Sequence, residues 1–484
     1  EEVRAKVIGE GANLGCTQAG RIEFALLGRN GAGGRINTDF IDNSAGVDCS
    51  DNEVNIKIAL EGARRAGRLA EAERVALLAG MTDDVANIVL EDNRLQALAL
   101  SIAEAGGVAA APSHIRLIEV LEELGQLDRK TEGLADAETF RRRAAEGRGL
   151  VRPELAVLLS TAKLALQATI EDSALPDDPG LADELLAKFP AAMRAPFRQD
   201  ILGHRLRREI VATRIANRMV NRLGPALPFE LAEEEAASPA QVAAAFVAAE
   251  RLLGLGETWD VLEAAAMPEP ARIALFTRTA EACRAQMADL LRAGIDMSAP
   301  CAVAEELAPG IAALSARAEA LLLSEARQRS TALAAELSAA GAPGDAIARV
   351  VHLADMDGAI GLARLARDNG QDPAALTRAF AALGAALGLD WAQGAAARMN
   401  PADPWERLLA AGLARDFQQV RLDFLRRACG PGCDPEAAVA AWQAGSEAAL
   451  HPFRALVDRA RASGAPTPAM LARIAAQARS LLLR

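Results

Sequence analysis

The sequence predicts a mostly α-helical protein that opens with a short α/β segment. Two apolar stretches near the amino end, residues 7–8 and 39–42, are strand candidates, and each runs into small and amide residues. After Glu53 the apolar residues recur at helical spacing, and turns containing Gly and Pro separate the helices. Alanine supplies much of the 51% hydrophobic content, and it has the highest helix propensity. We therefore expect an extended all-helical region after the first strands.

The amino-terminal segment has the length of a strand, a crossover helix and a parallel strand. The spacing from Asn13 to Asn43 matches the roughly 30 residues that such a unit needs. Both amides would then lie at the carboxyl edge of one sheet, where open α/β sheets bind their ligands. Small residues beside them would let a ligand approach the backbone closely: Gly11, Ala12, Ala45 and Gly46. The segment is thus predicted to be an incomplete dinucleotide-binding, Rossmann-like remnant.

The glycine-rich turn that normally receives the pyrophosphate of a dinucleotide has no counterpart before Ala5. Residues 28–34 are rich in glycine, but they follow a helical stretch and lead into a strand, so we interpret them as a flexible loop. The chain also begins at Glu1, inside the expected sheet. We therefore expect it to be the carboxyl-terminal piece of a longer protein.

Ser50 stands where the next helix is expected to begin. The unpaired amides and the positive dipole end of a helix favour an anion at such a position. Ser50 with Glu53 three residues later is equally a capping box for that helix. Taken alone, the capping role is the simpler interpretation.

These segments resemble the nicotinamide side of glutamate dehydrogenases. That family has a Glu-Gly-Ala-Asn segment, matched by residues 10–13, and an Asn-x-x-Gly-Val-x-x-Ser-x-x-Glu segment, matched without a gap by residues 43–53. Residues 152–159 and 204–210 look like parts of the very large bacterial NAD-specific glutamate dehydrogenases. The resemblance is specific over most of residues 1–260, and beyond them it depends on position and helical character only.

The resemblance implies an enzyme that uses NAD to oxidise L-glutamate to 2-oxoglutarate and ammonium. It assigns Asn13 and Asn43 to the nicotinamide ribose and carboxamide, and Ser50 to a carboxylate of the substrate. An uncharged amide suits a carboxamide because it both donates and accepts hydrogen bonds. The resemblance also implies a cytoplasmic homo-oligomer that uses no metal. The residues assigned to cofactor binding are Gly11, Ala12, Asn13, Asn43 and Gly46.

The family's catalytic Lys and its acid/base Asp have no counterpart in this chain, so we expect no catalytic residue here and an inactive fragment. Two alternatives stay open. One is a non-catalytic helical module for regulation or oligomerisation, and the other is the dehydrogenase of another amino acid, such as leucine or phenylalanine. Ser50 as a carboxylate ligand favours glutamate.

Three regions are expected along the chain. Residues 1–60 would be the last part of the NAD-binding domain, and residues 61–223 a helical region that packs on the catalytic domain. A turn at residues 223–228 would then lead to a peripheral all-helical domain, residues 224–484. Residues 204–222 interleave arginines with apolar residues, which predicts an amphipathic helix whose arginines pair with carboxylates.

Composition excludes several other classes of protein. The net charge of -12 argues against general nucleic-acid binding, which needs a cationic surface. The sequence has no uncharged apolar run of about 18 residues, so we expect no membrane span. The six cysteines and four histidines are too dispersed to form a metal cluster.

Overall fold

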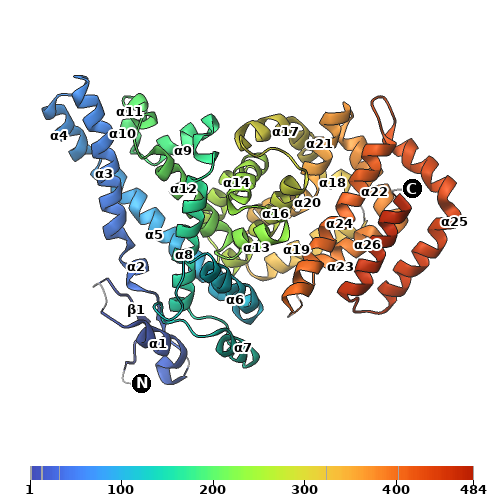
Figure 1. The fold of residues 1–484 in the computed structure, drawn as a ribbon, viewed down its shortest axis with the longest axis horizontal. Helices are drawn as coiled ribbons and strands as arrows, with labels where there is room; N and C mark the ends of the chain where they lie inside the picture. The colour runs from blue at the N-terminus through green and yellow to red at the C-terminus, as the bar shows by residue number, and fades with distance from the viewer. Residues whose placement is uncertain are drawn as a thin grey trace. The chain divides into compact units, whose positions relative to one another are not determined.

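Helices dominate the computed structural model, which describes residues 3–11, 15–31, 33–322, 324–399, 401 and 403–482. Its two strands, β1 (Val7–Ile8) and β2 (Arg35–Ile36), have two residues each and pair in parallel. The prediction of a mostly α-helical chain is confirmed (Figure 1). The chain divides into two compact units, the first mainly residues 1–232 and the second mainly residues 245–297 and 302–484.

Long helices joined by short turns make up the first unit. After the strands its helices are α1 (Gln18–Gly31), α2 (Asp39–Asp42), α3 (Ser44–Arg65), α4 (Glu71–Gly80), α5 (Thr82–Ala105), α6 (Gly107–Glu123), α7 (Ala137–Ala145), α8 (Arg152–Glu171), the 3-10 turns η1 (Leu175–Asp177) and η2 (Pro179–Leu181), α9 (Ala182–Ala187), α10 (Ala191–Arg194), α11 (Arg198–Leu202) and α12 (Arg207–Leu223). Helices α13 (Leu227–Glu234) and α14 (Pro239–Leu253) follow and contain residues of both units.

Helix α8 is the centre of the first unit. Pro153 stands in its first turn, a favoured position for proline, and residues 153–159 are all buried. Glu154 accepts the backbone N–H of Val151 at 2.9 Å and forms a two-pronged ion pair with Arg143, at 2.7 and 3.0 Å. Helices α1, α5, α6 and α12 all pack against α8. The buried carboxylate of Glu154, in the first turn of α8, therefore has its hydrogen-bond partners inside the core.

Helix α12 is amphipathic, as the sequence predicts. Ile215 and Met219 are fully buried on one side. On the other side, Arg214 and Arg218 both bind Glu184 of α9, at 2.8 and 2.6 Å. The arginine-rich helix thus pairs with carboxylates of its own unit.

Two glycines separate α5 from α6. Helix α5 runs from Thr82 to Ala105, directly before Gly106, and α6 begins at Gly107. Proline is favoured in the first turn of a helix, but Pro112 lies inside α6. Gly107 has a φ of +51°, a conformation that glycine adopts without strain, so the turn is completed five residues before the proline.

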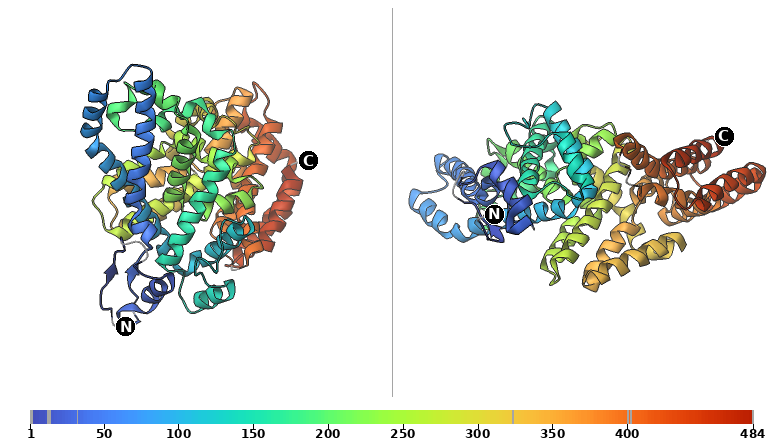
Figure 2. Two further views of the ribbon diagram at one scale, coloured as in Figure 1. Left: turned by 60° about the vertical axis from the view of Figure 1, so that its left-hand side comes forward. Right: turned by 90° about the horizontal axis from the view of Figure 1, so that it is seen from below.

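The second unit is all helical in its described residues. Its helices after α14 are α15 (Leu255–Ala264), α16 (Glu269–Arg292), α17 (Pro300–Ser315), α18 (Ala318–Leu321), α19 (Ser324–Ala339), α20 (Gly344–Asp355), α21 (Ala359–Asn369), α22 (Pro373–Leu387), α23 (Leu389–Ala397), α24 (Pro404–Ala428), α25 (Pro435–Ala462) and α26 (Pro468–Leu482). Helix α24 packs against α22, α23, α25 and α26, and α25 and α26 lie side by side (Figure 2).

Asp-Pro pairs start three helices of the second unit. Asp372, Asp403 and Asp434 each accept backbone N–H groups of the following first turn, and the proline after each stands where no N–H is needed. Pro309, in contrast, lies inside α17. All four tryptophans of the chain belong to this unit: Trp259, Trp391, Trp405 and Trp442.

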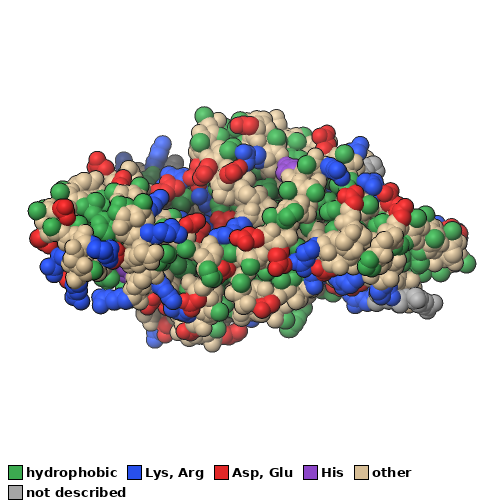
Figure 3. All heavy atoms as spheres, turned by 90° about the horizontal axis from the view of Figure 1, so that it is seen from above, with side chains coloured by type: hydrophobic (Ala, Val, Ile, Leu, Met, Phe, Trp, Pro, Cys, Tyr) green, Lys and Arg blue, Asp and Glu red, His purple; other side chains and the backbone are tan. Residues whose placement is uncertain are grey.

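Basic and acidic side chains are interspersed on the face drawn in Figure 3. None of the described helices is by itself long and apolar enough to cross a membrane. Helices α5 and α6 are long and apolar enough only when they are taken together, and the chain bends by 110° between them.

Candidate functional site

The two strands and the helix between them form the parallel unit that the sequence predicts, with one difference. Val7 pairs with Arg35 and Ile8 with Ile36, so β2 precedes the predicted second strand. Residues 39–42 form helix α2, and the prediction of a strand there is wrong. Two aspartates, Asp39 and Asp42, occupy its single turn, where acidic side chains complement the helix dipole. That local preference outweighs the short apolar pair between them.

Asn43 joins α2 to α3. It follows the last residue of α2, and its backbone carbonyl accepts the N–H of Gly46 at 3.2 Å. A Cβ at Gly46 would lie 3.4 Å from Asn43 Oδ1, an ordinary contact. Gly46 is therefore in the first turn of α3, directly beside the amide that the resemblance assigns to the nicotinamide.

Ser50 lies inside α3, and the prediction that a helix begins there is wrong. Its hydroxyl is exposed and donates to the carbonyl of Gly46 at 3.2 Å, one turn earlier. Glu53 pairs with Lys57, so no capping box forms at Ser50. The helix starts six residues earlier, since Asn43 already ends the short turn of α2. The amides of the first turn of this helix are those that follow Asn43.

Polar contacts, most of them partly buried, connect the segments that follow the two strands. Glu10 donates its backbone N–H to Asp42 Oδ2 at 3.0 Å, and Asn37 Nδ2 donates to Asp42 Oδ1 at 2.7 Å. The Glu10 carboxylate is buried, and it accepts Arg21 Nε and the backbone N–H of Cys16, both at 2.7 Å. The hydrogen bond from Arg21 is the main reason why the pKa of Glu10 is lowered. These contacts hold the chain after β1 against the chain after β2.

Helix α8 completes this network through its first residue. Arg152 Nε donates to Asn37 Oδ1 at 2.8 Å, and its Nη1 reaches Ser101 and Glu104 of α5 at 3.2 and 3.1 Å. Gln18 of α1 donates to the carbonyl of Pro153 at 3.0 Å. The segment at residues 152–159, which carries part of the family resemblance, therefore supports the strand tips directly. We call this set of connected side chains the strand-tip network: Glu10, Arg21, Asn37, Asp42 and Arg152.

A second polar chain begins at Ser44, the neighbour of Asn43. Ser44 Oγ donates to Asn93 Oδ1 at 2.5 Å and accepts Gln96 Nε2 at 3.2 Å. Gln96 Oε1 in turn accepts Lys163 Nζ at 3.0 Å. Burial lowers the pKa of Lys163 to about 7, so this lysine can lose its proton near neutral pH.

Four of the six assigned residues lie in the described part of the chain: Gly11, Asn43, Gly46 and Ser50. Gly11 is exposed directly after the buried Glu10, and a Cβ there would meet no atom of the described residues within 4 Å, its chain neighbours aside. The described residues therefore leave the backbone at Gly11 open. Asn43 and Gly46 adjoin one another at the start of α3. Ala12 and Asn13 lie outside the described residues, so whether Asn13 and Asn43 meet stays a prediction.

Sequence reasoning missed the residues that hold these segments. Asn37, Asp42 and Arg152 make the decisive contacts, and Asn37 and Arg152 are separated by 115 positions. A usable signal was the charged Arg152 directly before the Pro153 that starts a buried helix. Among the described residues, no group of three His, Cys, Asp or Glu side chains is close enough to hold a metal ion.

Known protein families cover most of the chain. Residues 147–480 match the family described as "Glutamate dehydrogenase, C-terminal", and residues 1–103 match the one described as "Bacterial NAD-glutamate dehydrogenase, catalytic domain". The chain belongs to the bacterial NAD-specific glutamate dehydrogenase family. The two matched regions include the whole strand-tip network. Arg152 lies within residues 147–480, and the other four members lie within residues 1–103.

Individual relatives support this membership. The chain is 35% identical to proteins named "NAD-specific glutamate dehydrogenase" from Mycobacterium tuberculosis and Pseudomonas aeruginosa, over 99% and 97% of its length. It is also 35% identical, over 84% of its length, to the protein of that name from Halomonas elongata. The chain spans only 25 to 29% of the length of these glutamate dehydrogenases.

Proposed function

We propose that this chain forms part of an NAD-dependent glutamate dehydrogenase. The reaction is the oxidative deamination of L-glutamate to 2-oxoglutarate and ammonium, in which water replaces the amine and NAD accepts a hydride from the Cα of glutamate. The observation that supports this proposal best is the strand-tip network, since it fixes two loops of a parallel unit at the edge where such units bind ligands.

The nicotinamide side of the cofactor would lie on these loops. In this proposal the two strands and α1 would be the last part of a Rossmann-like domain whose earlier part lies outside this chain. Asn43 would offer a neutral amide to the carboxamide or ribose, which leaves the cationic ring free of added charge. The surroundings of Gly11 agree with this role because the backbone is open there. The residues proposed to bind NAD are Gly11, Ala12, Asn13, Asn43 and Gly46.

Ser50 would bind a carboxylate of glutamate from the exposed side of α3. Its hydroxyl already donates to the carbonyl of Gly46, so it would have to rotate when the substrate binds. A serine hydroxyl turns freely between acceptors, so the rotation itself costs little.

The remaining expectations concern assembly. Residues 61–223 would pack on the rest of the catalytic domain, and residues 224–484 would form a peripheral helical domain of a cytoplasmic homo-oligomer. Exposed apolar side chains near the site support such packing, since Val47 and Leu90 are 75% and 66% exposed on α3 and α5. Sedimentation of the complete enzyme would test the oligomer, and a monomer would contradict it.

The assignment of Asn43 is testable in the complete enzyme. Replacing Asn43 with Ala should raise the KM for NAD about tenfold, because one hydrogen-bonding group of the cofactor loses its partner. Asn87, exposed on α5, provides a matched control, and its change to Ala should leave the KM unchanged. Equal kinetics for the two variants would contradict the cofactor role.

The role of Ser50 and the behaviour of the isolated chain are tested separately. In the complete enzyme, Ser50→Ala should raise the KM for glutamate and leave that for NAD unchanged. Purified residues 1–484 should not reduce NAD with glutamate. Turnover by this chain alone would show that the catalytic groups lie within it.

A further inference from the structure

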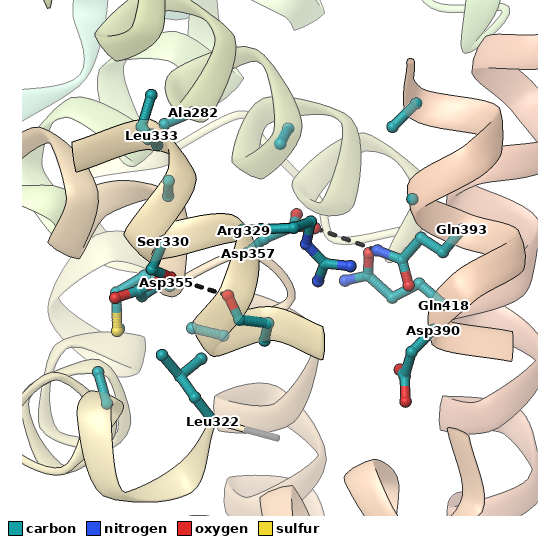
Figure 4. A pocket seen from close by; sticks show the side chains of 18 of the residues that line it. Ala282, Leu322, Arg329, Ser330, Leu333, Asp355, Asp357, Asp390, Gln393 and Gln418 are labelled. Carbon is teal, nitrogen blue, oxygen red and sulfur yellow. Dashed lines mark hydrogen bonds between the residues drawn. The ribbon is translucent and has the colours of Figure 1, made fainter. Parts of the chain in front are cut away.

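A cavity of about 860 Å³ lies inside the second unit, apart from the strand-tip network. Helices α16 to α24 all contribute to its walls, which are mostly apolar, with Leu314, Leu333, Phe380 and Trp391 among the lining residues. Its volume is within the range of about 300–1,000 Å³ that is typical of small-molecule sites. Figure 4 shows polar side chains from several helices pointing into it.

The carboxylate of Asp357, in the wall of the cavity, is already paired. Arg415 Nη1 lies 2.9 Å from Asp357 and 3.4 Å from Asp289, and Gln418 Nε2 donates to Asp289 at 2.9 Å. Gln393 Nε2 donates to the other oxygen of Asp357 at 3.1 Å. These hydrogen bonds connect α16, α23 and α24 with one another and with Asp357.

The same holds for the other carboxylates. Asp390 binds the fully buried Arg421 at 2.5 Å, and the guanidinium of Arg421 lies 3.9 Å from the ring centre of Phe380. Asp355 accepts a hydrogen bond from Ser330. A cationic ligand would have to compete with these contacts.

Two arginines of the cavity are different. Arg329 of α19 and Arg398 at the end of α23 each bring Nη1 close to Gly394, 3.1 and 3.2 Å from where a Cβ at that glycine would lie. Neither makes a hydrogen bond or a close ion pair with any residue in the described part of the chain, and both side chains are exposed. The positive charge of Arg329 does act on Asp355 and Asp357, and it favours the ionised form of both carboxyl groups. Figure 4 shows Arg329 reaching toward Gln393 and Gln418.

Two guanidinium groups beside one glycine repel each other, and an anion bound by both would offset part of that repulsion. Arginine also presents a planar set of donors that matches the oxygens of a carboxylate or phosphate. The absence of a side chain at Gly394 lets both guanidinium groups approach the surface of α23, where one anion could reach both.

We propose that this cavity binds a small organic anion, a carboxylate or phosphate with an apolar body. Its charged end binds Arg329 and Arg398, and its body packs against apolar wall residues such as Trp391 and Leu333. This inference does not depend on the proposed dehydrogenase activity, because it concerns a separate unit of the chain.

Benzoate, phenyl phosphate and uncharged benzyl alcohol are suitable probes, with calorimetric titration of the 484-residue chain. We expect benzoate or phenyl phosphate to bind and benzyl alcohol to bind at least tenfold more weakly, since charged hydrogen bonds dominate. The tighter of the two anions identifies the source as carboxylate or phosphate. Binding of neither anion at about 1 mM would overturn the proposal.

The arginines are tested by substitution. The double variant Arg329→Gln/Arg398→Gln should weaken anion binding at least tenfold. Arg327, exposed on the same helix and outside the cavity wall, is the matched control, and Arg327→Gln should bind as the native chain does. Equal losses in the double variant and the control would overturn the site.

Gly394→Ala offers a test that keeps both charges. The added Cβ would push the two guanidinium groups outward, while alanine stabilises a helix relative to glycine. We expect weaker anion binding together with an unchanged or higher melting temperature, which separates loss of the site from loss of the fold. Full binding by this variant would show that the anion does not lie against Gly394.

Discussion

His114 should make the first unit sensitive to mild acid. This histidine is buried in α6, and its Nδ1 has no hydrogen-bond partner among the described residues. Burial lowers the pKa of His114 from 6.5 to about 4, although the charge of Glu230 acts in the opposite direction. The side chain is therefore neutral in the folded protein at neutral pH.

Protonation of His114 favours the unfolded chain. Because the folded pKa lies below the unfolded one, acid protonates His114 in the unfolded chain before it does so in the folded chain. Its contribution to stability is complete above about pH 6.5 and is lost as the pH falls toward 4. The pKa difference corresponds to about 3 kcal/mol in total, of which about 2 kcal/mol is lost between pH 7 and pH 5.

Hydrogen exchange of the α6 and α8 amides at pH 7 and pH 5 measures this loss. After correction for intrinsic exchange, the opening free energy of the native chain should fall about 2 kcal/mol more than that of a His114→Leu variant. His451, which is exposed on α25, provides the control, and His451→Gln should behave like the native chain. The same pH dependence in the native chain and the His114→Leu variant would refute the reasoning.

Three further predictions concern buried groups. Glu154→Ala leaves the Arg143 guanidinium unpaired in the core and should lower the free energy of unfolding by about 3–5 kcal/mol, measured with urea; a loss near zero would contradict the pairing. Gly149→Ala would place its Cβ 2.5 Å from the carbonyl oxygen at the start of α6 and should cost about 1–3 kcal/mol in the same assay. Burial raises the pKa of the Cys283 thiol, so a thiol reagent at neutral pH should label the exposed Cys49 and spare Cys283, as peptide mapping would show.

The sequence was sufficient for the helical class, because alanine-rich helical spacing is local in the chain. A parallel strand pair does form, but the spacing that predicted it ran to residues 39–42, which are helical. The position of the second strand was wrong because Phe40 and Ile41 looked like a strand, while the aspartates beside them favour a helical turn. The boundary of α3 then moved with it, from Ser50 to Ser44.

The supports of the candidate site were out of reach of sequence reasoning. Arg152 has the features of a helix start, and nothing near it in the chain indicates that its guanidinium binds Asn37. The same is true of Lys163, which lies on an apolar helix and reaches Ser44 only through Gln96 of another helix. Contacts of this kind depend on how helices cross, which no local pattern encodes.

The placement of all four tryptophans in the second unit makes the two halves optically distinct. The chain contains no tyrosine, so its near-ultraviolet emission comes almost entirely from residues after 245. Fluorescence during denaturation would follow only that half, whereas far-ultraviolet dichroism would follow both. A difference between the two curves would therefore reveal the melting of the half that contains the strands, without any label.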